Sequence, residues 1–562
     1  MVYSQPCLPE GITFTTQELI DSFQTNYPNC TEIEGDVFIY GSENITNLYG
    51  LNILTSIGGK FFVVGNQSLI DFSGLENLIE IGGFFHIGDY DGAFGFYNES
   101  LTSLSGLEGL TSIGGDFWIM WNEALTNLSG LSGLSSVGEN LIVNANESLV
   151  SLTGLEGLNS IGGDLKISSN SSLNTLWGLE NLDLSTINSL SIYYNNSLST
   201  CEIPNLCSYL DTLNVPLAIY GNNTGCNNPS EIAETCGIEF SCLPFGDYYF
   251  VSQADIDSFS SDYPDCTQLQ GSTFIRGINI SNLYGLNIVT RIGDGGLHIQ
   301  NNELLTDLTG LDNLETISGN LIIGGEYPSN CNNSLFTLSG LSLLDTVGGG
   351  LYIGYNINLS TFSGLEGLKS IGGYLNIVRN INLTDISALS QLSNIEGDMV
   401  IGGWVPYQGN FILQSLSGLE NIAPNSIENL VIGHNPVLSE CEVVSICEYL
   451  AAPIGDVSIF FNTTGCNSPE QVEDACESVD IFKVAYNNKI SFFPNPATDK
   501  LIVSTNQEMK IKSLSIYNQL GQEVVHKNKA CEKIDVSTLD QGIYIVELEL
   551  IELKVRKKLI IK

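Results

Sequence analysis

A repeat of about 24 residues constrains this chain more than any other feature. Three consecutive copies begin at Leu101, Leu125 and Leu149, and they read LTSLSGLEGLTSIGGDFWIMWNEA, LTNLSGLSGLSSVGENLIVNANES and LVSLTGLEGLNSIGGDLKISSNSS. Self-similarity at a fixed period of this length indicates a solenoid, in which each repeat buries its apolar face against its neighbours. Because solenoids offer extended surfaces, the repeat favours a binding function over catalysis.

Within the repeat, apolar residues alternate after a Gly-Gly pair, as in LxxLxGLxxLxxIGGxLxIxxNxx. This period of two predicts a strand with Leu165 and Ile167 facing inward and Lys166 and Ser168 facing outward. The Gly-Gly pair suits a turn that needs a positive φ. We expect the asparagine after the strand to bond neighbouring backbone groups and to form a ladder through the stack. The first ladder positions are Asn66, Asn122, Asn146 and Asn170.

Twelve of the 14 cysteines form two matching sets, offset by 235 to 240 residues, and the sets indicate a tandem duplication. An even count at repeated spacing, without CxxC pairs, predicts disulfides in an oxidising compartment. The cysteines lie at the ends of each copy, where disulfide-bonded caps close a solenoid core. At each C-terminal cap we expect the first cysteine to pair with the third and the second with the fourth. The expected pairs are Cys7–Cys30, Cys201–Cys226, Cys207–Cys236, Cys242–Cys266, Cys441–Cys466 and Cys447–Cys476. Cys331 and Cys531 have no counterparts and are expected to be unpaired.

The charge of the chain is uneven. Of 19 basic and 63 acidic residues, 12 and 9 lie in residues 489–562, so the remaining 7 and 54 give residues 1–488 a formal charge of −47. A body with so few cations cannot neutralise a phosphate backbone, which argues against nucleic acid as a partner. The acidic side chains either keep the surface hydrated and the protein soluble, or they attract divalent cations or basic partners. The change of sign near residue 488 marks a domain boundary.

The IGGxLxI-x-x-N rhythm, the LxGLxxL stretch and the cysteine-closed ends resemble receptor L domains, the β-solenoid modules of the insulin and EGF receptor ectodomains. The resemblance covers residues 1–237 and 238–477. It implies a mainly β fold class, with two tandem right-handed β-solenoid domains of leucine-rich-repeat type. It does not imply a kinase or hormone binding. Residues 478–488 are expected to be a linker.

Residues 489–562 change character, with more lysine, less glycine and alternating apolar strands separated by turns, a pattern typical of a small Ig-like β-sandwich. The segment also resembles the type A C-terminal sorting domain of the type IX secretion system. The landmarks are Phe493, Pro494, Asn495, Pro496, Tyr517, Asn518, Gly521, Gly542, Tyr544, Lys557 and Lys558. The resemblance implies export by the type IX machinery to the extracellular space or the outer-membrane surface of a Gram-negative bacterium. That family carries a signal peptide, which we expect upstream because MVYSQPCLPEG is not one.

Three insertions break the 24-residue period directly after a strand: GDYDGAFGFYNES, GGEYPSNCNNS and GGWVPYQGNF. Insertions of this kind lie on one face of a solenoid, often the binding face, although loop variation is also tolerated there. The outward strand positions bear a row of aromatic residues, and Arg379 lies just beyond that row. An exposed row suits a glycan or protein partner, or it packs against the other solenoid or a returning insertion. The candidate binding residues are Phe62, His86, Tyr90, Phe94, Phe96, Tyr97, Trp118, Met120, Trp121, Tyr327, Tyr352, Tyr355, Trp404 and Tyr407.

Motifs of catalysis are missing from the sequence. The four histidines have no metal-ligand spacing, and no nucleophile elbow, Walker loop or dinucleotide fingerprint occurs in a suitable context. No apolar run reaches the ~18–20 residues that cross a bilayer. We therefore expect neither an enzyme, a cofactor, a metal site nor a transmembrane segment. The favoured function is a secreted, surface-displayed adhesion or recognition protein, and the alternative is a structural spacer or surface-layer component without a specific ligand.

Overall fold

A computed structural model of the chain describes residues 6–41, 43–89, 97–212, 216–243, 246–325, 331–478, 490–493, 497–505, 511–518, 522–527, 533–550 and 554–562. By compactness the chain divides into two units, residues 1–305 with 309–320 and residues 306–308 with 321–562. The division falls inside the second cysteine-bounded copy. The four segments expected from the sequence, 1–237, 238–477, 478–488 and 489–562, therefore remain a prediction.

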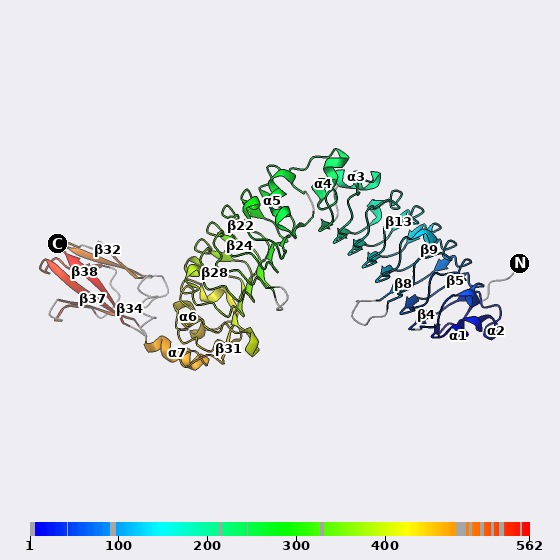
Figure 1. Cartoon of the computed structure of the whole chain (residues 1–562). Coiled ribbons are helices and arrows are strands. Elements are labelled where there is room, and N and C mark those ends of the chain that lie inside the picture. Colours follow the sequence, from blue (N-terminus) through cyan, green and yellow to red (C-terminus); the bar gives the residue numbers. More distant parts are fainter. Residues whose placement is uncertain are drawn as a thin grey trace. The chain divides into compact units, whose positions relative to one another are not determined.

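Parallel strands stacked at the spacing of the repeat build the first unit (Figure 1). Each regular coil contributes a two-residue strand and a longer one, and the longer strands pair in register, so that Trp118 lies beside Ile142. The longer strands are β2 Ile12–Phe14, β4 Val37–Tyr40, β6 Phe61–Val64, β8 Phe85–Gly88, β10 Phe117–Met120, β12 Leu141–Asn144, β14 Leu165–Ser168, β15 Leu190–Tyr193 and β16 Leu217–Tyr220. The short strands are β1 Pro6–Cys7, β3 Glu32–Ile33, β5 Ser56–Ile57, β7 Glu80–Ile81, β9 Ser112–Ile113, β11 Ser136–Val137 and β13 Ser160–Ile161.

The second array repeats this plan. Its first coils lie in the first unit, with β17 Tyr248–Phe250, β18 Gln268–Leu269, β19 Thr273–Ile275, β20 Arg291–Ile292, β21 Leu297–Ile299 and β22 Thr316–Ile317. In the second unit the longer strands run side by side in the order β23 Leu321–Gly324, β25 Leu351–Gly354, β27 Leu375–Val378, β29 Gly397–Gly402, β30 Ile427–Gly433 and β31 Val457–Phe460. The short strands there are β24 Thr346–Val347, β26 Ser370–Ile371 and β28 Asn394–Ile395.

The repeated leucines and the inward strand residues form the core of the arrays. In the coil that begins at Leu125, the side chains of Leu125, Leu128, Leu131, Val137 and Leu141 are all buried. Because each coil is only one repeat thick, this apolar face is covered by the coils before and after it. Removing it from water supplies most of the stability of the array.

Glycine has two distinct roles in the repeat. The glycine of LxGL takes a positive φ, +112° at Gly154, and a Cβ there would lie 2.0 Å from the carbonyl oxygen of Leu128. The Gly-Gly pair does not adopt a positive φ in these coils, contrary to our expectation. Its first glycine is required by close stacking instead, because a Cβ at Gly162 would lie 2.2 Å from the carbonyl oxygen of Gly138 in the preceding coil.

The asparagine ladder is confirmed. The side chain of Asn146 accepts a hydrogen bond from the backbone N–H of Asn122 at 3.1 Å, and its own backbone N–H donates to the side chain of Asn170 at 3.0 Å. Its Nδ2 donates to the carbonyl oxygen of Ile119 at 2.9 Å. The ladder is buried, which satisfies polar backbone groups that the turn after each strand leaves inside the protein. In the first array it also includes Asn98, Asn195 and Asn222, which replace or extend the expected positions.

Short helices and disulfides close the ends of the arrays. Thr16 caps the first helix by accepting a hydrogen bond from the backbone N–H of Leu19, and Ser252 and Asp255 form a capping box on the helix Gln253–Asp262. The helices are α1 Gln17–Asp21, α2 Phe23–Asn26, α3 Pro204–Asp211, α4 Pro229–Cys236, α5 Gln253–Asp262, α6 Val444–Ala451 and α7 Pro469–Ser478. The six disulfides are the expected ones: Cys7–Cys30, Cys201–Cys226, Cys207–Cys236, Cys242–Cys266, Cys441–Cys466 and Cys447–Cys476. Cys331 is buried and belongs to none of these six, and Cys531 lies outside the described residues.

The C-terminal segment forms two antiparallel sheets. One contains β32 Ile490–Phe493, β33 Lys500–Thr505 and β36 Lys533–Asp535. The other has the order β35 Glu523–Lys527, β34 Ile511–Tyr517, β37 Gly542–Leu550 and β38 Lys554–Ile561. Apolar residues on alternate strand positions, such as Leu514, Ile516, Val546 and Leu548, form a separate small core. The observed strands fit the expected alternation, and the Ig-like assignment remains a prediction.

Candidate functional site

A groove lies on the outward face of the longer strands of the second unit. The parallel register places Tyr352 of β25, Asn376 of β27 and Val400 of β29 side by side. Their neighbours along each strand are buried in the core, because successive side chains point to opposite faces. These three outward residues therefore form the floor of the groove.

The residues that follow β25 and β27 have a left-handed backbone. Tyr355 has a φ of 58° and Arg379 a φ of 56°, each directly before a ladder asparagine. Glycine fills the equivalent position at Gly65 and Gly221. Since a left-handed conformation costs an L-residue roughly 1–2 kcal/mol, a tyrosine and an arginine are held here against backbone strain. The same conformation recurs at Trp121, Ala145 and Ser169, so it belongs to the turn of the repeat and does not by itself mark a site.

An insertion forms one wall of the groove. It follows β29, contains the 3-10 helix η7 Pro406–Gln408, and carries Trp404 and Tyr407, whose side chains are 62% and 58% exposed. The carbonyl oxygen of Gln408 accepts from the backbone N–H of Arg379 at 2.7 Å, and Gln408 Oε1 accepts from the backbone N–H of Trp404 at 3.0 Å. The Trp404 ring also stacks on Phe460 of β31, with centroids 5.5 Å apart. The wall is thus anchored to coils on both sides.

A small apolar cluster forms the opposite wall. Cys331, Tyr355 and Val378 are each 6% exposed and pack together, and Tyr352 lies against them. The hydroxyl of Tyr352 donates to the carbonyl oxygen of Gly325 at 3.2 Å. Burial raises the pKa of the Cys331 thiol, and the nearby Arg379 cation opposes this effect. Tyr355, expected to be exposed, is therefore buried, because Cys331 and Val378 pack against it.

Glycines leave room for the hollow. A Cβ on Gly354 would lie 2.5 Å from a ring carbon of Tyr352, and Gly402 and Gly403 occupy the edge toward the insertion. The resulting cavity has a volume of about 790 Å³ and an apolar lining with a few polar groups. Binding sites for small molecules are hollows of this size and composition.

Two polar groups in the groove have no hydrogen-bonding or ionic partner among the described residues. Arg379 is half-buried with its guanidinium 4.9 Å from the centre of the Phe411 ring, and it makes no ion pair with a described carboxylate. The Oδ1 of Asn376 is buried and accepts no hydrogen bond from a described group. Buried polar groups of this kind are costly unless a ligand or solvent satisfies them.

The aromatic residues expected on the first array pack mainly on one another. Phe62 stacks on Phe38 with centroids 5.0 Å apart, and Phe84 contacts the edges of both Phe62 and Trp118. His86 is only 1% exposed, so the expected exposed row is interrupted there. Burial lowers the pKa of His86, whose Nε2 lies 3.2 Å from the carbonyl oxygen of Asp89.

Some of the remaining candidate binding residues are half-buried, and others lie outside the described residues. Met120 and Trp121 are half-buried, and the Trp121 ring lies 6.0 Å from that of Tyr97. Tyr90, Phe94, Phe96 and Tyr327 lie outside the described residues. The structure thus unites Tyr352, Tyr355, Trp404 and Tyr407 around one groove, whereas the described candidates of the first array lie outside it.

Sequence reasoning missed Asn376 and Gln408 as groove residues. Asn376 could have been found by aligning the strands, because it occupies the column of Tyr352 one coil later. Gln408 carried no such signal, since its place depends on how the insertion folds.

The sorting landmarks lie on or beside the strands of the C-terminal segment. Asn518 follows β34, and its Oδ1 accepts from the backbone N–H of Gln522 at 3.0 Å. The buried Tyr544 donates its hydroxyl to the carbonyl oxygen of Asp540 at 2.9 Å. Tyr517 ends β34, Gly542 begins β37, Phe493 ends β32, and Lys557 and Lys558 belong to β38. Pro494, Asn495, Pro496 and Gly521 lie outside the described residues.

The described part of the chain lacks a metal-binding cluster and a membrane-spanning helix. No cluster of three or more His, Cys, Asp or Glu side chains there is placed to hold a metal ion. No helix among those residues has the length and apolar character needed to cross a membrane.

Comparison with known proteins identifies the C-terminal segment. A search of curated proteins found no match. Among solved structures, a chain of the "Crystal structure of TLR13-ssRNA13 complex" is similar at 12% identity and a TM-score of 0.18, over 81% of this chain and 94% of that one. So low a TM-score carries no argument about fold or function. The family described as "Secretion system C-terminal sorting domain" matches residues 491–562. These residues are therefore a sorting domain of the type IX secretion system, which makes the chain a protein secreted to the cell surface or beyond.

Proposed function

We propose that this protein is a non-enzymatic binding protein, displayed on the surface of a Gram-negative bacterium, that recognises a glycan or protein ligand through the groove of the second unit. The exposed pair Trp404 and Tyr407 beside a hollow of about 790 Å³ carries this proposal. Exposure of a large aromatic side chain to water is unfavourable, because its apolar surface is not buried. Exposed aromatic side chains are therefore typical of surfaces that bind a ligand. The sorting domain supports an extracellular site of action.

The proposal extends to the architecture. We take the arrays to be two receptor L-domain-like solenoids, residues 1–237 and 238–477, and residues 489–562 to be an Ig-like β-sandwich. The disulfides Cys201–Cys226 and Cys441–Cys466, at matching places in the two copies, support the duplication. Caps at both ends of each copy are what separate solenoids would need, because each would otherwise expose its core.

The test is a ligand screen with the purified full chain, on a glycan array and by pull-down from outer-surface extracts. Trp404→Ala and Tyr407→Ala should each weaken binding at least about tenfold, as loss of an anchoring aromatic does. Trp177→Ala is the matched control, because Trp177 is 48% exposed on the first array and distant in sequence from the groove. Trp118→Ala and Trp121→Ala ask separately whether the first array contributes.

The outcomes separate recognition from the structural alternative. Binding that survives both groove substitutions but is lost in the Trp118 or Trp121 variants would move the site to the first array. Absence of any ligand in both assays would contradict recognition and favour a spacer or surface-layer component.

A further inference from the structure

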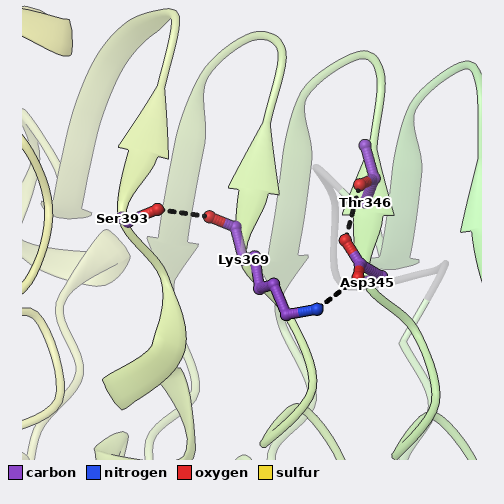
Figure 2. A network of polar contacts seen from close by, with 4 residues as sticks. All are labelled: Asp345, Thr346, Lys369 and Ser393. Carbon is purple, nitrogen blue, oxygen red and sulfur yellow. Dashed lines mark hydrogen bonds and ion pairs between the residues drawn. The ribbon is translucent and has the colours of Figure 1, made fainter.

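The second unit holds few cations in its repeats, and they are used differently. Between residues 321 and 478 the sequence contains two, Lys369 and Arg379. Lys369 forms an ion pair with Asp345 at 2.5 Å, and Figure 2 shows this contact between neighbouring coils, beside the bond from Ser393 to the Lys369 carbonyl oxygen. Its charge is therefore already matched by a carboxylate, away from the groove.

Arg379 has no such match among the described carboxylates. It lines the groove, is half-buried, and lies over the Phe411 ring. A half-buried guanidinium without a counter-charge loses hydration that a cation–π contact recovers only in part. Residues 1–488 have a formal charge of −47 and offer many carboxylates as possible partners. Arg379 nevertheless lines the groove and pairs with none of the described carboxylates.

The charge of the body limits what can pair with Arg379. A polyanion would be repelled by the surrounding acids, whereas a single negative charge at contact distance is attracted by the guanidinium and screened from acids beyond about 8 Å at physiological salt. A guanidinium matches a carboxylate through two parallel hydrogen bonds. The ligand is therefore expected to carry one carboxylate.

The rest of the lining fits sugar rings. Trp404 and Tyr407 offer exposed ring faces for the C–H faces of a saccharide, and Asn376 and Gln408 offer amides for hydroxyl groups. The volume of about 790 Å³ lies within the range of roughly 300–1,000 Å³ typical of small-molecule sites. It therefore suits a short saccharide rather than one ring or a long polymer chain.

We propose that the groove binds a short saccharide bearing one carboxylate, with Arg379 pairing the carboxylate and Trp404 and Tyr407 packing on the rings. This inference rests on the proposed function, because it names the ligand class of the same groove. It goes beyond that function by assigning a charge to the ligand and a separate task to Arg379.

The experiment is isothermal titration calorimetry of the full chain with two probes, sialyllactose and a glucuronic-acid disaccharide, and with the methyl ester of each. We expect the acids to bind and the esters to bind at least about tenfold more weakly, which is the effect of losing a charge-assisted pair. Arg379→Gln should weaken the acids by the same factor and leave the esters unchanged. Lys369→Gln, which removes the other cation, should leave both unchanged.

Each failure has its own signature. The carboxylate assignment would be overturned if acid and ester bound equally or if neither acid bound. It would also be overturned if Arg379→Gln left binding of the acids unaffected, or if the chain preferred a sulfated lactose. If neutral saccharides or a protein still bind and Trp404→Ala abolishes that binding, the proposed function stands without it. Arg379→Lys guards against misfolding, because it keeps the charge but not the paired donors, and it should bind the acids with intermediate affinity.

Discussion

Replacement of Asn146 by alanine tests whether the ladder holds the coils together. Asn146 is fully buried, and its side chain bonds three coils at once. It accepts from the backbone N–H of Asn122 at 3.1 Å and donates to the carbonyl oxygen of Ile119 at 2.9 Å. It also donates to the side chain of Asn170 at 3.2 Å.

The expected cost follows from the groups that alanine leaves behind. The Asn122 N–H loses the side-chain acceptor it has in the ladder, and the Ile119 carbonyl loses a donor, both in the interior. A buried donor or acceptor left unsatisfied costs about 1–3 kcal/mol, so the two together predict a loss of about 2–6 kcal/mol in the free energy of unfolding. A loss of that size is a large part of the stability of a typical domain.

The measurement is urea denaturation of the full chain, with amide hydrogen exchange to locate the weakened coils. Asn174→Ala is the matched control, because Asn174 is exposed and only its backbone hydrogen-bonds in the array. It should cost less than about 0.5 kcal/mol. Equal effects of the two substitutions, or unchanged exchange of the Asn122 amide, would refute the ladder as a source of stability.

Three further predictions concern other parts of the chain. Burial lowers the pKa of His86 below 6.5, so the folded state favours the neutral imidazole. The associated stability is intact above pH 6.5 and is lost as the pH falls through the lowered pKa. An NMR titration of His86 with a midpoint at or above 6.5 would contradict this. Replacing Cys207 and Cys236 together by serine should lower the free energy of unfolding by about 2–4 kcal/mol, and unchanged denaturation would show that the C-terminal cap does not need its bridge. A chain lacking residues 489–562 should accumulate in the periplasm, whereas its normal appearance outside the cell would contradict a sorting role.

Local rules in the repeat predicted much of the fold. The period of two placed Leu165 and Ile167 in the core, where the structure has them. The ladder asparagines followed from spacing, because identical coils stacked in register bring identical positions together. The matching cysteine sets predicted disulfide-bonded caps, whereas the pairing within each C-terminal cap was decided by the structure. The Gly-Gly pair was misjudged, since its glycine is needed for the approach of two coils, and a single repeat contains no information about that distance.

The candidate site was only partly predictable. Tyr352, Trp404 and Tyr407 were named from the outward columns and the insertions, and they do meet at one groove. His86 and Tyr355, one from each array, were expected to be exposed, yet both are buried, because neighbouring side chains cover them. Alternation tells which side of a strand a residue occupies, but not what covers that side.

The sequence by itself determined the repeat, the disulfide-capped ends and the sorting segment, because each depends on residues at regular or adjacent positions. Only the tertiary structure decided which outward residues form a site. Arg379 and Trp404 are 25 positions apart, and they line one groove because coils stack in register and Gln408 anchors the insertion to the coil of Arg379. Such a contact arises from the packing of an irregular segment on a regular array, and no period in the sequence encodes it.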